Sequence, residues 1–412
     1  MDIAAPFRET FRLPFFRILL AIIAIVLGLL AVATRSTSLG DRDLIRNDFT
    51  VDYLSGAAVL HGQDAFDPLA NLAHYAGPSS RYYEPATFVS RNVHPPADIA
   101  IMTPIAALPY RPARILWLIA MAACSGFAVG LLARALGVSF RWSIVVGIGA
   151  LAVPIFQKDL LYGQPNGLLL LLLVLGWLSL RKNSDRAAGV LLGITAALKL
   201  YPAVMAIPLI RERRWRALGW MVGTFVVATA GGVLVIGETA TRELVKPATP
   251  DNFAFWRAAP MNLSLPGIAY RWLTKSHWRA AGVDAPRVAG LLALILVALC
   301  VVAMIKTPAR LSGRYWATVP LMLLATPLVW DTYLVLIAPV LFAVLMSRRI
   351  EWWLLLALAI LAIGIPPALP SPPANVSDVA QVLGYALPTY ALIVVAISEW
   401  RLRGEAEPVY SV

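Results

Sequence analysis

Apolar runs long enough to cross a bilayer recur along the whole of this 412-residue chain. A membrane-spanning helix needs about 20 consecutive apolar residues, because the hydrocarbon layer is about 30 Å thick. Within hydrocarbon only helices and closed barrels satisfy their backbone hydrogen bonds, and the runs lack the alternation of a barrel strand. The sequence therefore predicts one all-α integral membrane domain over residues 1–412, a polytopic bundle of about 12 transmembrane helices.

The charged residues support this fold class and exclude nucleic-acid binding. They make up 14% of the chain, whereas soluble domains carry about a quarter. The net charge is +12, but the basic residues form short clusters at the ends of apolar runs, as in cytoplasmic membrane anchoring. A nucleic-acid surface would instead form a basic stripe. The clusters are Arg211, Arg213, Arg214 and Arg216; Lys306, Arg310 and Arg314; Arg348 and Arg349; Arg401 and Arg403.

The first span, 13–33, follows three arginines, which predicts a cytoplasmic N-terminus. The run also ends like a signal-peptide cleavage site, but the many later spans favour an uncleaved anchor. Two long polar loops follow, at 34–95 and 237–286. Residues 96–109 are apolar but short and contain Pro104 and Pro109, so we expect a helix on the membrane surface. The other spans are predicted at 112–136, 142–156, 167–180, 187–199, 201–210, 215–236, 287–305, 315–328, 330–346, 352–366 and 379–400.

The orientation of 96–109 decides the topology. If this segment does not cross, the basic ends near residues 134–141 and 181–186 face the cytoplasm, in agreement with the positive-inside rule. This requires a helical hairpin with its tip at Lys199–Pro202. Both long loops, the turn 157–167, the region of Lys199 and the turn before Trp330 then lie on the outer face. Their polar residues are therefore predicted to converge on one side.

Two polar segments near the first loop can carry chemistry. Asp48 follows the first span, where a carboxylate can remove a proton from an acceptor hydroxyl. The alternative is a helix N-cap before a helix at 53–60. His94 precedes Pro95-Pro96 and can donate to a phosphate, although the two prolines also suit a rigid helix start.

Lys199 lies between apolar residues on both sides. A lysine at that depth is costly in a bilayer and often lines a cavity, so it is a candidate partner for a phosphate. Snorkelling to the interface is the alternative. Gln164 and Asn166 lie in a turn between two spans, where their amides suit sugar hydroxyls and where turn chemistry is also sufficient.

A series of short motifs follows in order along the chain: Asp48-Phe49 with Tyr53, Gly62-Gln63-Asp64, Asp67-Pro68, His94-Pro95-Pro96, Pro104, Leu108-Pro109, Gly163-Gln164-Pro165-Asn166, Lys199 to Pro202 with the arginines of 211–216, Asn262-Leu263-Ser264, and Pro327 to Trp330. Together these motifs resemble the GT-C superfamily of membrane glycosyltransferases, and most of all glycosyltransferase family 87, whose members use polyprenyl-phosphate mannose. After the tryptophan of the last motif, relatives often carry histidines, whereas this chain has Asp331-Thr332-Tyr333.

The resemblance implies an inverting glycosyltransferase with Asp48 as its base and Asp52, one helical turn later, as the main competitor for that role. The expected donor is a polyprenyl-phosphate sugar, with mannose as the sugar. The expected acceptor is a glycolipid or glycan, and the expected site is the outer face of a bacterial cytoplasmic membrane. The residues expected to bind the donor are His94, Gln164, Asn166, Lys199, Arg257 and Arg271, and those expected to bind the acceptor are Asp52, Tyr53, Asn262 and Asp331.

A sugar on a lipid phosphate already has a good leaving group, so one carboxylate base and cations for the departing phosphate are sufficient. No cofactor or metal is therefore expected. The triplet Asp41-Arg42-Asp43 can hold a divalent cation, but such triplets are common. Two alternatives stay open: an arabinofuranosyltransferase with a polyprenyl-phosphate pentose, and a transporter or lipid flippase. A transporter would show internal symmetry and polar groups at the bilayer midplane.

Overall fold

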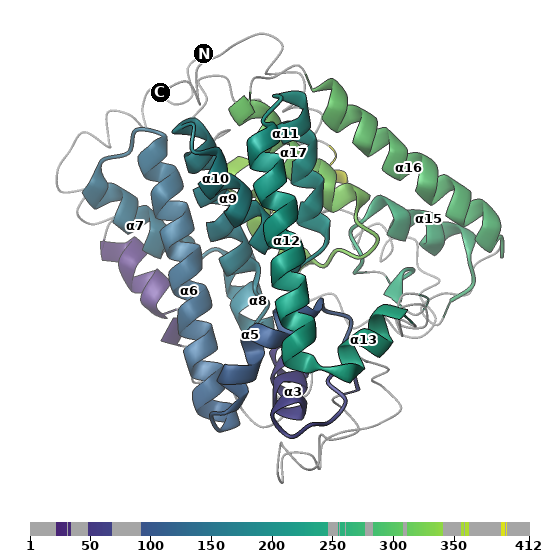
Figure 1. Ribbon diagram of the computed structural model, residues 1–412. Helices are drawn as coiled ribbons and strands as arrows, with labels where there is room; N and C mark the ends of the chain where they lie inside the picture. The colour runs from purple at the N-terminus through teal and green to yellow at the C-terminus, as the bar shows by residue number, and fades with distance from the viewer. Residues whose placement is uncertain are drawn as a thin grey trace.

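A computed structural model describes the parts of the chain that carry the candidate site. The described residues are 22–30, 32–33, 48–67, 92–245, 254, 256–259, 261–276, 283–307, 311–340, 356–357, 359–361, 389–391 and 393. The regular secondary structure of these residues is helical, without a β-strand, which confirms the all-α part of the predicted fold class. Figure 1 shows α3 at one end of the molecule and α11 at the other.

The helices follow the apolar runs closely. Their bounds are α3 Asp48–Leu60, α5 Pro96–Ala106, α6 Tyr110–Ala135, α7 Phe140–Ala150, α8 Pro154–Tyr162, α9 Asn166–Arg181, α10 Asp185–Leu198, the 3-10 helix η5 Tyr201–Met205, α11 Ala206–Arg211, α12 Trp215–Ile236, α13 Glu238–Val245, α15 Leu265–Leu273, α16 Pro286–Lys306, α17 Leu311–Ala325 and the 3-10 helix η6 Asp331–Ile337.

Three described helices, α6, α12 and α16, are long and apolar enough to span a membrane. A fourth span results if the bent pair α7 and α8 is counted as one. The predicted total of about 12 spans is therefore not confirmed. The predicted spans at 352–366 and 379–400 lie almost entirely outside the described residues, as does the triplet Asp41-Arg42-Asp43.

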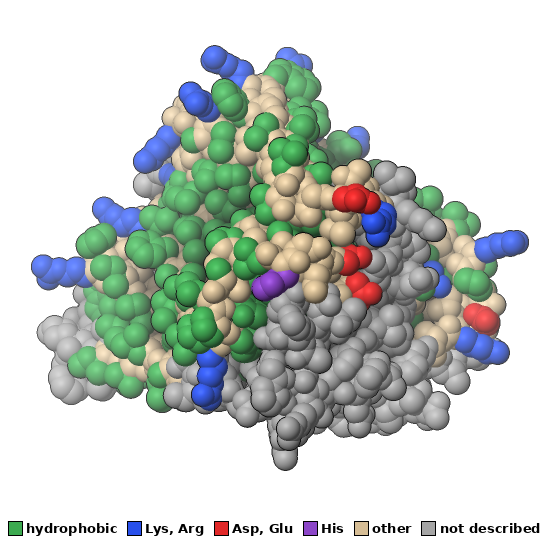
Figure 2. Space-filling model, turned by 60° about the horizontal axis from the view of Figure 1, so that its bottom comes forward, with side chains coloured by type: hydrophobic (Ala, Val, Ile, Leu, Met, Phe, Trp, Pro, Cys, Tyr) green, Lys and Arg blue, Asp and Glu red, His purple; other side chains and the backbone are tan. Residues whose placement is uncertain are grey.

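The outer surfaces of these helices suit a lipid environment. On α12 and α16 large apolar side chains are exposed, among them Leu234 (83%), Val227 (72%) and Leu294 (65%). Figure 2 shows hydrophobic side chains over large parts of the described surface, with Lys and Arg side chains projecting at its edges. Apolar area of this extent on an isolated soluble domain would cause aggregation, so it is expected to contact lipid.

The predicted span at 142–156 is not one straight helix. Two helices, α7 and α8, meet there at an angle of 61°. Pro154 begins α8, and the residue before it, Val153, has an extended backbone. Proline lacks an amide hydrogen and disfavours a helical conformation in the preceding residue, so the first helix cannot continue. The predicted turn at 157–167 therefore contains most of α8.

Proline and glycine end the helices around the site as the sequence predicts. α10 ends at Leu198, and Lys199 is extended with φ −140° and ψ 130°, shortly before Pro202. Gly163 ends α8 in the left-handed conformation, with φ +69°, which glycine adopts without strain. Pro96 lies in the first turn of α5, where a missing amide hydrogen costs nothing.

The basic helix ends meet at one end of the bundle. Arg181 Nη1 donates to Ala135 O at 3.4 Å, which joins the ends of α9 and α6. Arg214 contacts Asp185 at 3.1 Å, which joins the starts of α12 and α10. Asn166 and Lys199 lie at the opposite ends of α9 and α10. A helix of the length of α9 is about 24 Å long, so the polar turns are well separated from the arginines.

The helix α5 is too short to cross a bilayer, since its 11 residues span about 17 Å. It packs between α3 and α12. Its buried residues include Asp98, Ile99 and Met102, so it is covered by protein on one side at least. Whether it lies flat at the interface stays a prediction, as does the orientation of the bundle in the membrane.

A cysteine at position 184 tests the orientation. Ser184 is exposed in the turn between α9 and α10, beside the arginines. In a background with Cys124→Ala and Cys300→Ala, we expect Ser184→Cys to react with an impermeant maleimide only after spheroplasts are permeabilised. His61→Cys, exposed just after α3 at the other end, is expected to react in intact spheroplasts. Labelling of Ser184→Cys in intact spheroplasts would overturn the topology with a non-crossing α5.

Candidate functional site

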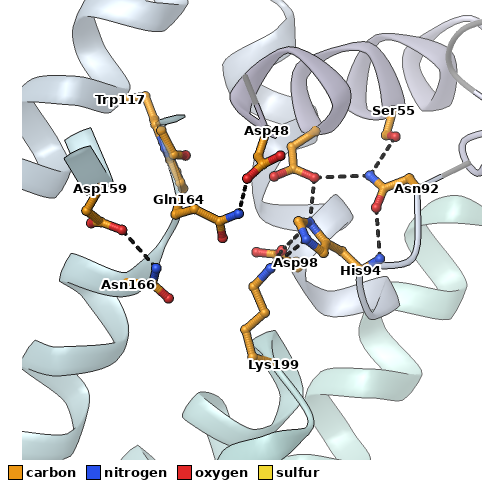
Figure 3. Close-up of polar contacts among 12 residues, drawn as sticks. Asp48, Ser55, Asn92, His94, Asp98, Trp117, Asp159, Gln164, Asn166 and Lys199 are labelled. Carbon is orange, nitrogen blue, oxygen red and sulfur yellow. Dashed lines mark hydrogen bonds and ion pairs between the residues drawn. The ribbon is translucent and has the colours of Figure 1, made fainter. Parts of the chain in front are cut away.

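Four segments that are far apart in the sequence bring their polar residues together. These segments are the start of α3, residues 92–98, the turn at 163–166 and the end of α10. Figure 3 shows Asp48, His94, Asp98, Gln164 and Lys199 facing a common space between these elements. The predicted convergence of the polar turns on one side of the bundle is therefore confirmed for these segments.

Asp48 is the first described residue of α3, and Gln164 donates a hydrogen bond to its Oδ2. Burial raises the pKa of Asp48, because the charged form loses its hydration. The Gln164 hydrogen bond and the neighbouring cationic pair of His94 and Lys199 lower this pKa again, the charge of Asp52 raises it, and the net direction is upward. A carboxylate with a raised pKa accepts a proton more readily, which suits a general base.

Lys199 and His94 form a buried pair. Lys199 is only 4% exposed, and its Nζ lies 2.6 Å from His94 Nε2 and 3.7 Å from Asp98 Oδ2. Two nitrogens at 2.6 Å must share one proton, because two N–H groups cannot face each other at that distance. The ammonium therefore does not snorkel to the surface, and the pair presents one positive charge to the site.

Two carboxylates hold the other nitrogen of His94. Its Nδ1 lies 2.7 Å from Asp52 Oδ1 and 3.1 Å from Asp98 Oδ2. Burial lowers the pKa of His94, but the charge of Asp52 and the hydrogen bonds to both carboxylates raise it. The resulting pKa is about 9, above the usual value for histidine. The positive charge of the Lys199–His94 pair is therefore retained at neutral pH.

Asn92 holds Asp52 and His94 in position through hydrogen bonds. Its Nδ2 donates to Asp52 Oδ1 at 3.1 Å and to Ser55 Oγ at 2.8 Å, and its Oδ1 accepts from the backbone amide of His94 at 2.8 Å. Sequence reasoning missed both Asn92 and Asp98. One signal was present: Asp98 follows His94 by four residues at a proline-started helix, a spacing that brings two side chains together.

Asn166 faces Asp159. Its Nδ2 donates to Asp159 Oδ1 at 2.8 Å, and both side chains are buried. The contact joins α8 to α9 beside the site. Asp159 is a further residue that sequence reasoning did not select.

The predicted residues of the second loop build a separate junction. Asn262 Nδ2 donates to Arg257 O at 3.0 Å and to Pro327 O at 2.9 Å. Arg271 is 2% exposed and donates to Ala259 O and Asn262 O. Arg257 lies 4.4 Å above the ring of Tyr270. Among the described residues, these side chains hold α15 against the segment before η6, and none of them contacts Asp48 or Lys199.

Two other predicted acceptor residues also have protein partners. Tyr53 donates to Leu108 O at 2.9 Å and packs in a buried cluster with Phe49. Asp331 forms an ion pair with Lys158, which joins η6 to α8. The role in acceptor binding stays a prediction for both residues.

Three of the site residues have the geometry of a cation site. One ligand atom from each of Asp52, His94 and Asp98 lies within 4.8 Å of the others. Two carboxylates and an imidazole can bind a divalent cation. Lys199 already supplies a positive charge at this place, however, so a second cation would be repelled.

Comparison with known proteins identifies the family. The sequence model of glycosyltransferase family 87 matches residues 92–327, more than half of the chain. The chain belongs to glycosyltransferase family 87. It is therefore a glycosyltransferase, and the transporter alternative is not supported. The match includes His94, the turn at 163–166 and Lys199, but it begins after Asp48.

Two curated relatives agree with this family. Both are named polyprenol-phosphate-mannose-dependent alpha-(1-2)-phosphatidylinositol pentamannoside mannosyltransferase. The protein from Mycolicibacterium smegmatis is 25% identical over 301 residues, which cover 66% of this chain and 67% of that protein. The protein from Mycobacterium tuberculosis is 28% identical over 199 residues, 46% of this chain and 42% of that protein. No solved structure matches this family-87 chain.

Proposed function

We propose that this protein transfers a mannosyl group from a polyprenyl-phosphate mannose to a hydroxyl of a glycolipid or glycan acceptor. The reaction would take place in a single membrane-embedded domain at the outer face of the cytoplasmic membrane. Family membership and the donor in the names of both relatives support the donor class. The observation that carries the mechanism is the buried Lys199–His94 cation pair close to the carboxylate of Asp48.

In the proposed reaction, Asp48 takes the proton of the acceptor hydroxyl. The acceptor oxygen bonds to the anomeric carbon, and the bond from that carbon to the phosphate oxygen breaks with its electron pair leaving on the phosphate. A single displacement with one carboxylate base inverts the anomeric configuration. Lys199, backed by His94, stabilises the negative charge of the departing lipid phosphate.

The reaction as proposed needs no cofactor, because the chain supplies its own cation. Lys199 is held by Asp98 and His94, and Asp52 accepts a hydrogen bond from His94 Nδ1. A metal-free reaction is consistent with the chemistry of a phosphate that leaves without protonation. The membrane is required because the donor carries a long apolar chain that partitions into lipid.

An assay with radiolabelled donors tests the proposal. Purified protein in nanodiscs is incubated with a phosphatidylinositol mannoside acceptor and either polyprenyl-phosphate mannose or polyprenyl-phosphate arabinose, with and without EDTA. We expect labelled glycolipid from the mannose donor only, unchanged by EDTA and with inverted anomeric configuration by NMR. Product from the arabinose donor alone would establish the pentose alternative, and retained configuration would contradict the single displacement.

A further inference from the structure

A buried arginine lies behind the proposed base. Arg114 is in α6, the first described helix that is long enough to span a membrane, and its side chain is 0% exposed. An ionisable residue in such a helix is costly and is retained where it has a task. Arg114 forms no ion pair with a described residue, and its Nε and Nη1 have no hydrogen-bond partner among them. Neutralising a carboxylate in direct contact is therefore not its role.

The guanidinium contacts the two segments whose side chains form the Asp48–Gln164 hydrogen bond. Its Nη2 donates to Leu160 O at 3.0 Å and to Leu161 O, two carbonyls in the last turn of α8. Its Cζ lies 5.0 Å from the ring centre of Phe49, the neighbour of Asp48. One side chain thus joins the start of α3 to the end of α8, from which the turn with Gln164 continues.

The same turn is held from α6 by a second side chain. Trp117 Nε1 donates to Gly163 O at 2.7 Å, immediately before Gln164. A Cβ atom at position 163 would lie 2.6 Å from Phe49 Cβ and would also collide with the guanidinium of Arg114. The close approach of three segments therefore requires glycine there, in addition to its φ of +69°.

From these contacts we infer that Arg114 is a positioning residue, which sets the geometry of the Gln164–Asp48 hydrogen bond with the support of Trp117 and Gly163. The inference rests on the proposed role of Asp48 as base. Arg114 itself touches neither the acceptor hydroxyl nor the donor phosphate. Its effect is on where Asp48 points and on how firmly Gln164 holds it.

Substitution of Arg114 tests this role against a merely structural one. In Arg114→Met, we expect turnover to fall about tenfold or more, because a displaced catalytic group loses much of its effect. The KM for the donor should change less than about twofold, since Lys199 is untouched. The acid limb of the pH profile should move to higher pH, because Asp48 loses a hydrogen bond that lowers its pKa. Arg134→Met makes the same change at an exposed position of α6 and should leave turnover, the KM for the donor and the acid limb unchanged.

A double-mutant cycle with Gln164→Leu identifies the path of the effect. If Arg114 acts through Gln164, the double variant should lose about as much turnover as the worse single variant. If the loss of turnover in the double variant instead equals the product of the two single losses, the residues act independently and the inference is overturned. A wild-type acid limb and turnover in Arg114→Met, with only a lower unfolding temperature, would also overturn it.

Two further variants keep the test decisive. If Arg114→Met does not fold, Trp117→Phe removes the hydrogen bond to Gly163 and keeps an aromatic ring in the buried cluster, and the acid limb should still move to higher pH. An unmoved limb in that variant would refute the inference. Asp48→Asn separates the two proposals: full turnover in this variant refutes the proposed function, whereas an inactive Asp48→Asn beside a fully active Arg114→Met refutes only the role of Arg114.

Discussion

Replacement of Asp48 by asparagine is expected to reduce turnover at least about a hundredfold, because a positioned general base contributes a factor of about 10² to 10⁴. Asparagine keeps the shape of the side chain and its oxygen still accepts the hydrogen bond from Gln164. It is also favoured at helix starts, so α3 should form normally. Donor binding should survive, since His94 and Lys199 are unchanged. The measurement is turnover at saturating donor, with donor KM followed in parallel.

The pH dependence of the wild-type enzyme belongs to the same prediction. Only the deprotonated carboxylate accepts the proton, so kcat/KM should rise with pH through the pKa of Asp48. Burial raises that pKa, which places the acid limb above the usual range of an aspartate. Asp48→Asn should lose this limb together with its activity.

Asp52→Asn is the matched control for the identity of the base. Asp52 is 3% exposed and holds His94 Nδ1 at 2.7 Å, so its loss should act through the histidine. We expect this variant to weaken donor use more than turnover at saturation. An inactive Asp52→Asn beside an active Asp48→Asn would move the base to Asp52, one turn further along α3.

The second large effect is expected at Lys199. In Lys199→Met, the departing phosphate loses a charge-assisted hydrogen bond, which costs about 1.5 to 3 kcal/mol. Donor use, measured as kcat/KM for the polyprenyl-phosphate sugar, should therefore fall about tenfold or more. The burial of the ammonium beside His94 and Asp98 supports this expectation over a role at the surface.

The controls for Lys199 separate charge from folding. Lys182→Met makes the same change at an exposed position just after α9, at the end of that helix away from the site, and should leave donor kinetics unchanged. Lys199→Met also leaves Asp98 without its cation, so thermal unfolding is measured for each variant. A folded Lys199→Met with wild-type kcat/KM for the donor would show that the lysine serves only to balance the carboxylates.

The sequence by itself determined the fold class, most helix ends and several members of the site. Runs of apolar residues require helices in a membrane whatever the neighbouring chain does, because the backbone must satisfy its own hydrogen bonds. Pro202, Gly163 and Pro96 mark helix ends through local sterics alone. The isolation of Lys199 between apolar residues was likewise visible, since a cation there must find a partner.

Only the tertiary structure decided which partners meet. His94 contacts Asp52, which is 42 residues away in the sequence, and Lys199, which is 105 residues away. The hydropathy of a segment indicates that it is buried, but it does not indicate which residues it packs against. The same limit explains why Asn262 and Arg271, polar and prominent in sequence, belong to the junction at α15. It also explains why Arg114 was not selected, since an arginine near a helix start resembles a membrane anchor. Its task became visible only when the ends of α3 and α8 were found against its guanidinium.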